Sequence, residues 1–165
     1  MFYLLLFFPV ALILVAFQSA ILNPLSIAGG HFDILTIFLV LLTLYGSREL
    51  ALLSAMVMAP IADAVAGVPL GVSVLPMLSV ITLAHWGGKT IFGARLGWPV
   101  LVIFLGVLLS GAITLIELYL LGWNLPWSDL VLRVLLPTTF LNGLAAFAVY
   151  LPVVLISERQ ELHLE

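Results

Sequence analysis

Residues 98–121 read WPVLVIFLGVLLSGAITLIELYLL and carry a single charged side chain, Glu117. A helix of about 20 apolar residues crosses the roughly 30 Å hydrocarbon core of a bilayer, so this stretch predicts a transmembrane helix. Residues 1–22 form a second run of this kind. Because that run lacks a basic start and exceeds the apolar part of a signal peptide, about 7 to 15 residues, we interpret it as a retained first helix.

The composition of the whole chain agrees with a membrane location. Apolar residues make up 64% and charged residues 8%, against roughly 25% charged residues in an ordinary soluble domain. The net charge of -3 comes without any basic run, so nucleic acid is not an expected partner. The absence of cysteine excludes disulfides, thiolate metal sites and a cysteine nucleophile. These features predict an all-α polytopic membrane protein in which residues 1–165 form a single helical bundle.

Turn-forming residues divide the chain into about six candidate helices. The predicted helices are Phe2–Leu22, Asp33–Tyr45, Glu49–Ala66, Leu70–Trp86, Trp98–Leu121 and Leu130–Ile156. The second is short for a full span, and we expect its neighbours to shield it in part.

The basic residues predict the orientation of the bundle. If the helices alternate in direction, Arg48, Lys89, Arg95 and Arg159 lie on one side, and the excess of positive charge marks that side as cytoplasmic. Both termini are then cytoplasmic, in a multi-pass protein of the bacterial inner membrane. Arg133 alone falls near the opposite side. Because all connections are short, we expect function to reside among the helices.

Two predicted helices carry small residues at helical spacing. In the third helix these positions end in a carboxylate, and the fifth helix repeats the arrangement. Such stripes allow helix backbones to approach closely, so they indicate a partner interface, a polar pocket or ordinary packing within the bundle. The two stripes are Ala51, Ala55, Ala59, Asp63 and Gly67, and Gly106, Ser110, Thr114 and Glu117.

Ionisable residues within predicted spans are candidates for function. Asp63, Glu117 and Arg133 lie at a similar depth, a few residues inside the outer ends of their helices. They could form a buried polar clamp or, alternatively, a ligand or proton site. Asn142, near the middle of the sixth helix, is expected to form an interhelical hydrogen bond.

Motifs of catalysis are missing from the sequence. It contains neither a His-Glu-x-x-His helix nor a Gly-x-Ser-x-Gly elbow. His31, His85 and His163 fall in an outer loop, at an inner helix end and in the tail, too scattered for one metal site. We therefore expect no enzymatic activity, no cofactor and no metal.

The string Asp63-Ala-Val-Ala-Gly67-Val-Pro69-Leu70-Gly71 resembles the bacterial rod-shape-determining MreD family, which typically has Asp, then Gly, then Pro-Leu-Gly at this place. Other features of that family occur in the same order, so that the resemblance covers nearly the whole chain. They are Asp33 before the second helix, Gly46 and Arg48 in the inner turn, Glu117 late in the fifth helix, and Asn142-Gly143 in the sixth.

The resemblance implies a non-enzymatic scaffold of the cell-elongation machinery. Its partners would be a bitopic MreC-like membrane protein and the peptidoglycan synthases of the elongation complex, with a homodimer and membrane lipid as further expected contacts. The family is also similar in fold to the substrate-binding components of energy-coupling-factor transporters. Ala16 and Ala20 in the first helix resemble the small-residue contact by which those components dock.

A substrate-capture subunit of such a vitamin transporter is therefore the alternative. A capture subunit should close polar loops over its ligand, whereas a scaffold can present a lipid-exposed groove to a partner helix. The outer loops of this chain have few polar side chains, and residues 67–69 are too few to form a lid. The sequence thus favours the scaffold, with the two small-residue stripes and the groove beside the first helix as candidate interfaces.

Overall fold

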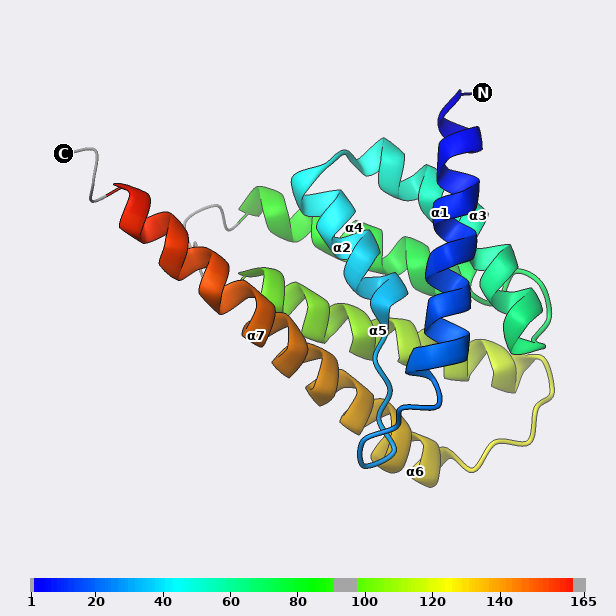
Figure 1. Ribbon diagram of the computed structural model, residues 1–165. Helices are drawn as coiled ribbons and strands as arrows, with labels where there is room; N and C mark the ends of the chain where they lie inside the picture. The colour runs from blue at the N-terminus through cyan, green and yellow to red at the C-terminus, as the bar shows by residue number, and fades with distance from the viewer. Residues whose placement is uncertain (1, 91–97, 162–165) are drawn as a thin grey trace.

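The computed structural model describes residues 2–90 and 98–161, and every regular element in these ranges is a helix (Figure 1). Two segments, labelled η, are π-helical and continue an adjacent α-helix. The elements are α1 (Phe2–Phe17), η1 (Gln18–Leu22), α2 (Ile34–Tyr45), α3 (Arg48–Ala66), α4 (Val74–Thr90), α5 (Trp98–Leu120), α6 (Trp127–Leu130), η2 (Val131–Leu135) and α7 (Leu136–Glu161).

These elements lie close to the helices predicted from the sequence. The clearest difference is the start of α4, which begins at Val74 instead of Leu70 because the preceding residues form a turn. The sixth predicted helix begins earlier than expected, at Trp127, and includes the π-helical segment η2. The all-α class is thus confirmed for the described residues.

Three helices are long and apolar enough to cross a membrane, namely Arg48–Ala66, Trp98–Leu120 and Trp127–Ala148. Three further apolar helices are shorter, namely Phe8–Leu22, Ile34–Tyr45 and Val74–Gly87. This arrangement suggests a membrane protein. The predicted cytoplasmic residue Arg95 and the tail residue His163 lie outside the described residues.

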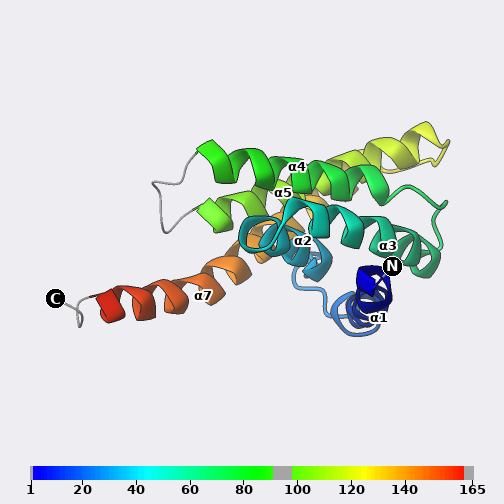
Figure 2. The same ribbon diagram turned by 90° about the horizontal axis from the view of Figure 1, so that it is seen from above.

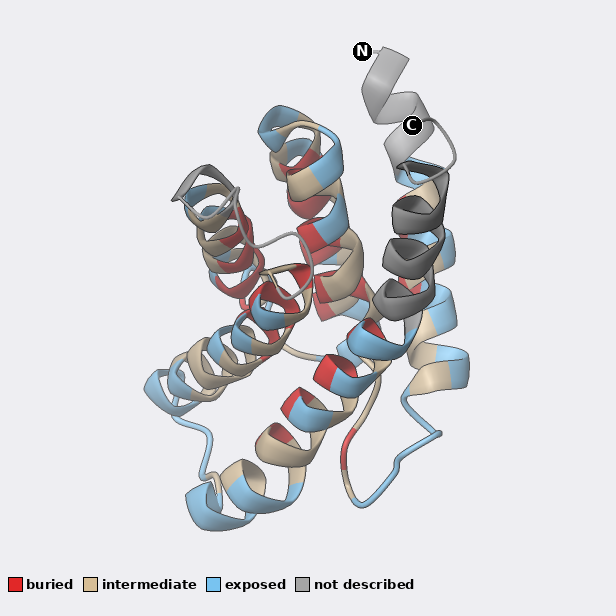
Figure 3. Cartoon of the chain, turned by 90° about the vertical axis from the view of Figure 1, so that its left-hand side faces the viewer, coloured by how far each residue is buried: buried red, intermediate tan, exposed pale blue. Residues whose placement is uncertain are grey.

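The short helix α2 forms the centre of the bundle. It packs against α3, α4 and α5, and its Leu39 and Val40 are completely buried. Buried residues line the sides of the helices that face one another, while the opposite sides are exposed (Figure 3). Hence α2 is shielded by its neighbours, as expected from its length.

The first and last helices lie at the edges of the bundle. α1 packs mainly on α3, where Ala11 and Val15 join the same apolar cluster as Ala51 and Ala55. α7 packs on α5 and extends away from the other helices toward its C-terminal end (Figures 1 and 2). α1 therefore contributes one face to the core, while its Leu12, Ile13 and Phe17 side chains are exposed.

Candidate functional site

The carboxylate of Asp63 joins the end of α3 to the start of α4. Its Oδ2 accepts a hydrogen bond from the Gly71 backbone N–H at 2.7 Å, and its Oδ1 accepts from the N–H of Ser73 at 3.0 Å and from the Ser73 hydroxyl. The residue is completely buried. Gly71 and Ser73 precede α4, which begins at Val74, so the carboxylate supplies acceptors for backbone N–H groups of the turn before this helix. Asp63 thus has a structural role in this turn.

Gly67, a candidate interface residue in the sequence, serves the same turn. It ends α3 in the left-handed conformation, with φ +70°, and its N–H bonds to the Asp63 carbonyl. Glycine adopts this conformation without the steric cost of a side chain. The geometry of the turn thus accounts for a glycine at this position.

The predicted clamp of Asp63, Glu117 and Arg133 does not form. The Nε of Arg133 lies 3.2 Å from Oδ1 of Asp129, one turn earlier in the chain, and both side chains are largely exposed. The Oε2 of Glu117 is buried without a hydrogen-bond partner among the described residues. The arginine has its partner on its own helix, and an exposed pair avoids the cost of burying charges inside the bundle.

The connection between η1 and α2 enters the bundle as extended backbone. It begins with a tight turn in which Ile27 and Gly30 exchange two backbone hydrogen bonds of 2.9 Å. Gly30 then passes so close to α7 that a Cβ atom would lie 2.6 Å from the carbonyl carbon of Pro137. Only glycine permits this approach, which brings residues 31–33 into the interior.

Two side-chain amides hold this extended backbone from opposite helices. Asn142 on α7 donates from Nδ2 to the His31 carbonyl and accepts from the Asp33 N–H, both at 2.8 Å. Gln18 on η1 donates to the Phe32 carbonyl at 2.7 Å and accepts from the Ile34 N–H at 2.9 Å. Each amide thus bonds a carbonyl and the N–H two residues later, as a neighbouring β-strand would. We call Gln18 and Asn142 the amide clasp.

The amide clasp satisfies the backbone that precedes α2. Non-helical backbone within an apolar interior must have its polar groups satisfied by protein. Asp33 completes the arrangement by capping α2, because its carboxylate accepts from the N–H and the hydroxyl of Thr36 at 3.0 and 2.6 Å. Sequence reasoning predicted a polar role for Asn142 but expected a partner on another helix, and it missed Gln18 entirely.

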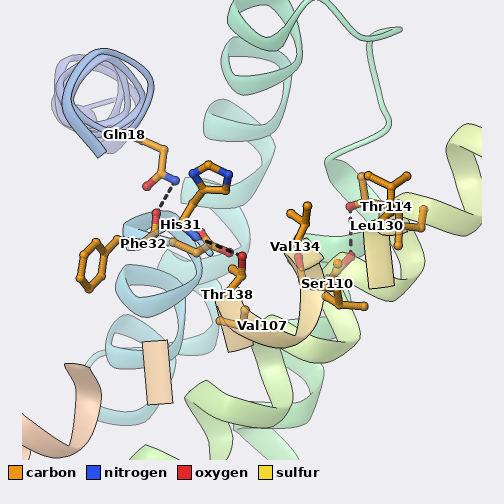
Figure 4. A pocket seen from close by; sticks show the side chains of 13 residues that line it. Gln18, His31, Phe32, Val107, Ser110, Thr114, Leu130, Val134 and Thr138 are labelled. Atoms are coloured by element: carbon orange, nitrogen blue, oxygen red, sulfur yellow. Dashed lines mark hydrogen bonds between the residues drawn. The ribbon is translucent and has the colours of Figure 1, made fainter. Parts of the chain in front are cut away.

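A cavity of about 300 Å³ lies beside the amide clasp, between η1, residues 31–33, α5 and the α6–η2–α7 helix (Figure 4). We call it the α5–η2 cavity. Its lining residues are Gln18, His31, Phe32, Asp33, Val107, Ser110, Gly111, Thr114, Leu115, Leu130, Val134, Leu135 and Thr138. Ser110 and Thr114, part of the predicted stripe on the fifth helix, thus line a cavity.

The small residues of α3 are not available to a partner. Ala51, Ala55 and Ala59 are at most 2% exposed and belong to the apolar core shared with α1, α2 and α4. On α5, Gly106 is buried against Val80 and Thr36 of the same chain. The structure therefore corrects the predicted interface roles of Ala55, Ala59 and Gly106, because the chain itself covers these positions.

Ala16 and Ala20 are the remaining small-residue candidates, and both are exposed. They lie on α1 and η1 beside exposed apolar side chains, of which Ile13 is 67% and Ile21 47% accessible. These residues form an exposed apolar surface on α1 and η1 that includes small side chains.

No cluster of three or more metal-ligating side chains occurs within residues 2–90 and 98–161. The Nδ1 of His31 lies 3.0 Å from the carbonyl oxygen of Asn23, which makes this nitrogen the donor. His31 therefore holds the connection between η1 and α2. Comparisons with known protein families, with curated proteins and with solved structures found no match.

Proposed function

We propose that this protein is a non-enzymatic scaffold of the bacterial inner membrane, similar to the MreD family. In this proposal six helices cross the membrane with both termini in the cytoplasm. The bundle docks a bitopic MreC-like protein and thereby supports the peptidoglycan synthases of the elongation complex. Its own contribution is a fixed arrangement of helices against which a partner helix packs.

The observation that carries the proposal is the bonding of Asp63. The Asp-x-x-x-Gly-x-Pro-Leu-Gly string is the main point of resemblance to MreD, and its carboxylate is fully buried and bonded to Gly71 and Ser73. A catalytic or ligand-binding carboxylate would need an open approach for its substrate. A carboxylate that is bonded within the chain instead favours a structural role for this motif, and a scaffold requires such a fixed structure.

The exposed surface around Ala16 and Ala20 is the proposed docking face for the partner helix. Small residues allow a second helix to approach closely, and in a bilayer such packing drives helix association. The larger side chains Ile13 and Ile21 flank these alanines and are exposed, so they can form the walls of a shallow groove. The buried alanines of α3 have no part in this contact.

A second candidate function is substrate capture for an energy-coupling-factor-type transporter. The α5–η2 cavity favours it, because 300 Å³ reaches the lower end of the roughly 300 to 1,000 Å³ typical of ligand pockets. The ionisable side chains in its lining, His31 and Asp33, are both engaged with backbone groups. This engagement makes capture of a polar vitamin the weaker of the two proposals.

The test is copurification of the tagged protein in mild detergent from its native bacterium, at its natural level, followed by mass spectrometry. We expect an MreC-like protein together with wall-synthesis enzymes. Recovery of transporter ATPases and their membrane coupling subunit would contradict the scaffold and support substrate capture.

Variants of the docking face make the test specific. The double variant Ala16→Leu and Ala20→Leu should lose the partner, because the added side chains keep the two helices apart. Ala64→Leu is the matched control, because Ala64 is also an exposed alanine but lies on α3. This variant should retain the partner. If both variants unfold at the same temperature as the wild type, the bundle is intact. Recovery of equal amounts of the partner with both variants would exclude this docking face.

A further inference from the structure

We propose that the α5–η2 cavity binds one hydrocarbon chain of a membrane lipid. This inference goes beyond the scaffold function and assigns a ligand class to the cavity. It would hold whether or not an MreC-like protein is the partner.

α5 and η2 form an apolar wall of the cavity. This wall consists mainly of the apolar side chains Val107, Leu115, Val134 and Leu135. The hydroxyl of Thr114 donates to the Ser110 carbonyl of its own helix at 3.0 Å. A hydrocarbon chain can therefore lie along this wall without leaving that hydroxyl unpaired.

The polar wall of the cavity has few free groups. The Gln18 amide is bonded to the Phe32 carbonyl (Figure 4) and to the Ile34 N–H. The Asp33 carboxylate is bonded to Thr36. A polar solute would have to break these bonds or lose its hydration without replacement, and both cost free energy. An apolar chain carries no such penalty, and the cavity therefore favours a lipid chain over a water-soluble molecule.

The cavity lies between helices that diverge. α5 and the α6–η2–α7 helix separate toward the end at which α6 lies (Figure 1). They are in close contact at Gly111, where a Cβ atom would lie 2.3 Å from Cδ1 of Leu135. On the same two helices, Ile116 and Leu132 are 49% and 63% exposed. In a bilayer these surfaces face lipid, and a chain can enter the cavity from the side.

π-Helical segments often occur at functional sites. Both such segments of the described chain contribute to the cavity, η1 through Gln18 and η2 through Val134 and Leu135. The widened turns place these side chains around one space. Two separate departures from α-helical geometry thus coincide at the proposed site.

The experiment uses the full chain in vesicles of phosphatidylethanolamine and phosphatidylglycerol. A trace of phosphatidylethanolamine carries a diazirine in one acyl chain, and irradiation is followed by mass-spectrometric mapping of labelled residues. We expect labelling of Leu115 and Val134 in the cavity. The variant Val134→Trp fills the cavity with a larger side chain and should reduce labelling of Leu115 about tenfold. This reduction corresponds to a loss of about 1.4 kcal/mol in the free energy of lipid binding.

Leu132→Trp is the matched control, because Leu132 lies in the same segment but is 63% exposed. It should leave labelling of Leu115 unchanged. If Val134→Trp fails to fold, Ser110→Phe fills the cavity from the opposite helix and should have the same effect. Labelling confined to exposed residues such as Ile116 and Leu132, or unaltered by both cavity variants, would overturn the proposal.

Discussion

Two non-helical connections of this bundle, residues 67–73 and residues 27–33, satisfy their backbone polar groups in different ways. The first is held by Asp63, whose bonded partners Gly71 and Ser73 are 8 and 10 residues away in the chain. The second is held by the amide clasp, in which Asn142 bonds to residues 109 and 111 positions away. The comparison teaches that a local turn can be stabilised by its own sequence, whereas backbone inside the bundle depends on distant helices.

The largest effect is expected for Asn142→Leu. Asn142 is completely buried, and the substitution leaves the His31 carbonyl and the Asp33 N–H without partners inside the bundle. Since each unsatisfied buried group costs about 1 to 3 kcal/mol, we expect a loss of about 3 kcal/mol in the free energy of unfolding. Equilibrium unfolding in detergent measures this, and Leu144→Ala at an exposed position of the same helix is the control.

A smaller effect, about 2 kcal/mol, is expected for Asp63→Ala. The substitution removes the acceptor of the Gly71 and Ser73 N–H groups, but Gly71 is exposed and water can replace part of the loss. Asp63→Asn keeps one acceptor oxygen and should fall between the wild type and Asp63→Ala. If Asp63→Ala unfolds at the same denaturant concentration as the wild type, the carboxylate does not hold this connection.

Double variants sharpen the comparison, because members of one hydrogen-bonded arrangement are energetically coupled. Gln18→Leu and Asn142→Leu act on the same backbone, so their combined effect should differ from the sum of the single effects by about 1 kcal/mol. Asp63→Ala shares no partner with Asn142→Leu, and this pair should be additive within about 0.5 kcal/mol. Additivity in both pairs would refute the amide clasp.

The smallest effect is expected for Arg133→Ala, which removes an exposed ion pair with Asp129. Exposed ion pairs contribute about 0 to 1 kcal/mol to stability, so the free energy of unfolding should change by less than about 0.5 kcal/mol. Adding Arg133→Ala to Asp63→Ala should give no rescue. A restored stability in that double variant would instead support the buried clamp that the sequence suggested.

Much of the fold can be predicted from the sequence because apolar runs and turn residues are local signals. The six predicted helices and the Asp63 to Gly71 string are of this kind. The role of Gln18 could not be predicted, because its partners are backbone groups of a segment that no periodic pattern identifies. The prediction that Arg133 joins Asp63 and Glu117 was wrong, because residues at equal depth on different helices need not lie close together. Arg133 instead pairs with Asp129 on its own helix, at an exposed position.

The burial of the α3 alanines shows a related limit. A stripe of small residues indicates a close helix contact, but it does not distinguish a helix of the same chain from a partner. Here α1 fills that role with Ala11 and Val15, and therefore the proposed docking face moves to the exposed side of α1. The identity of the covering helix depends on the tertiary arrangement, which a single sequence pattern does not contain.

Hydrogen exchange of the wild-type protein tests most directly the central claim that these polar side chains hold backbone in place. We predict slow exchange for the amides of Asp33, Ile34, Gly71 and Ser73, and fast exchange for the exposed Ser26 and Ala28, which share a connection with the first two. Exchange of Asp33 and Ile34 as fast as that of Ser26 and Ala28 would contradict the account.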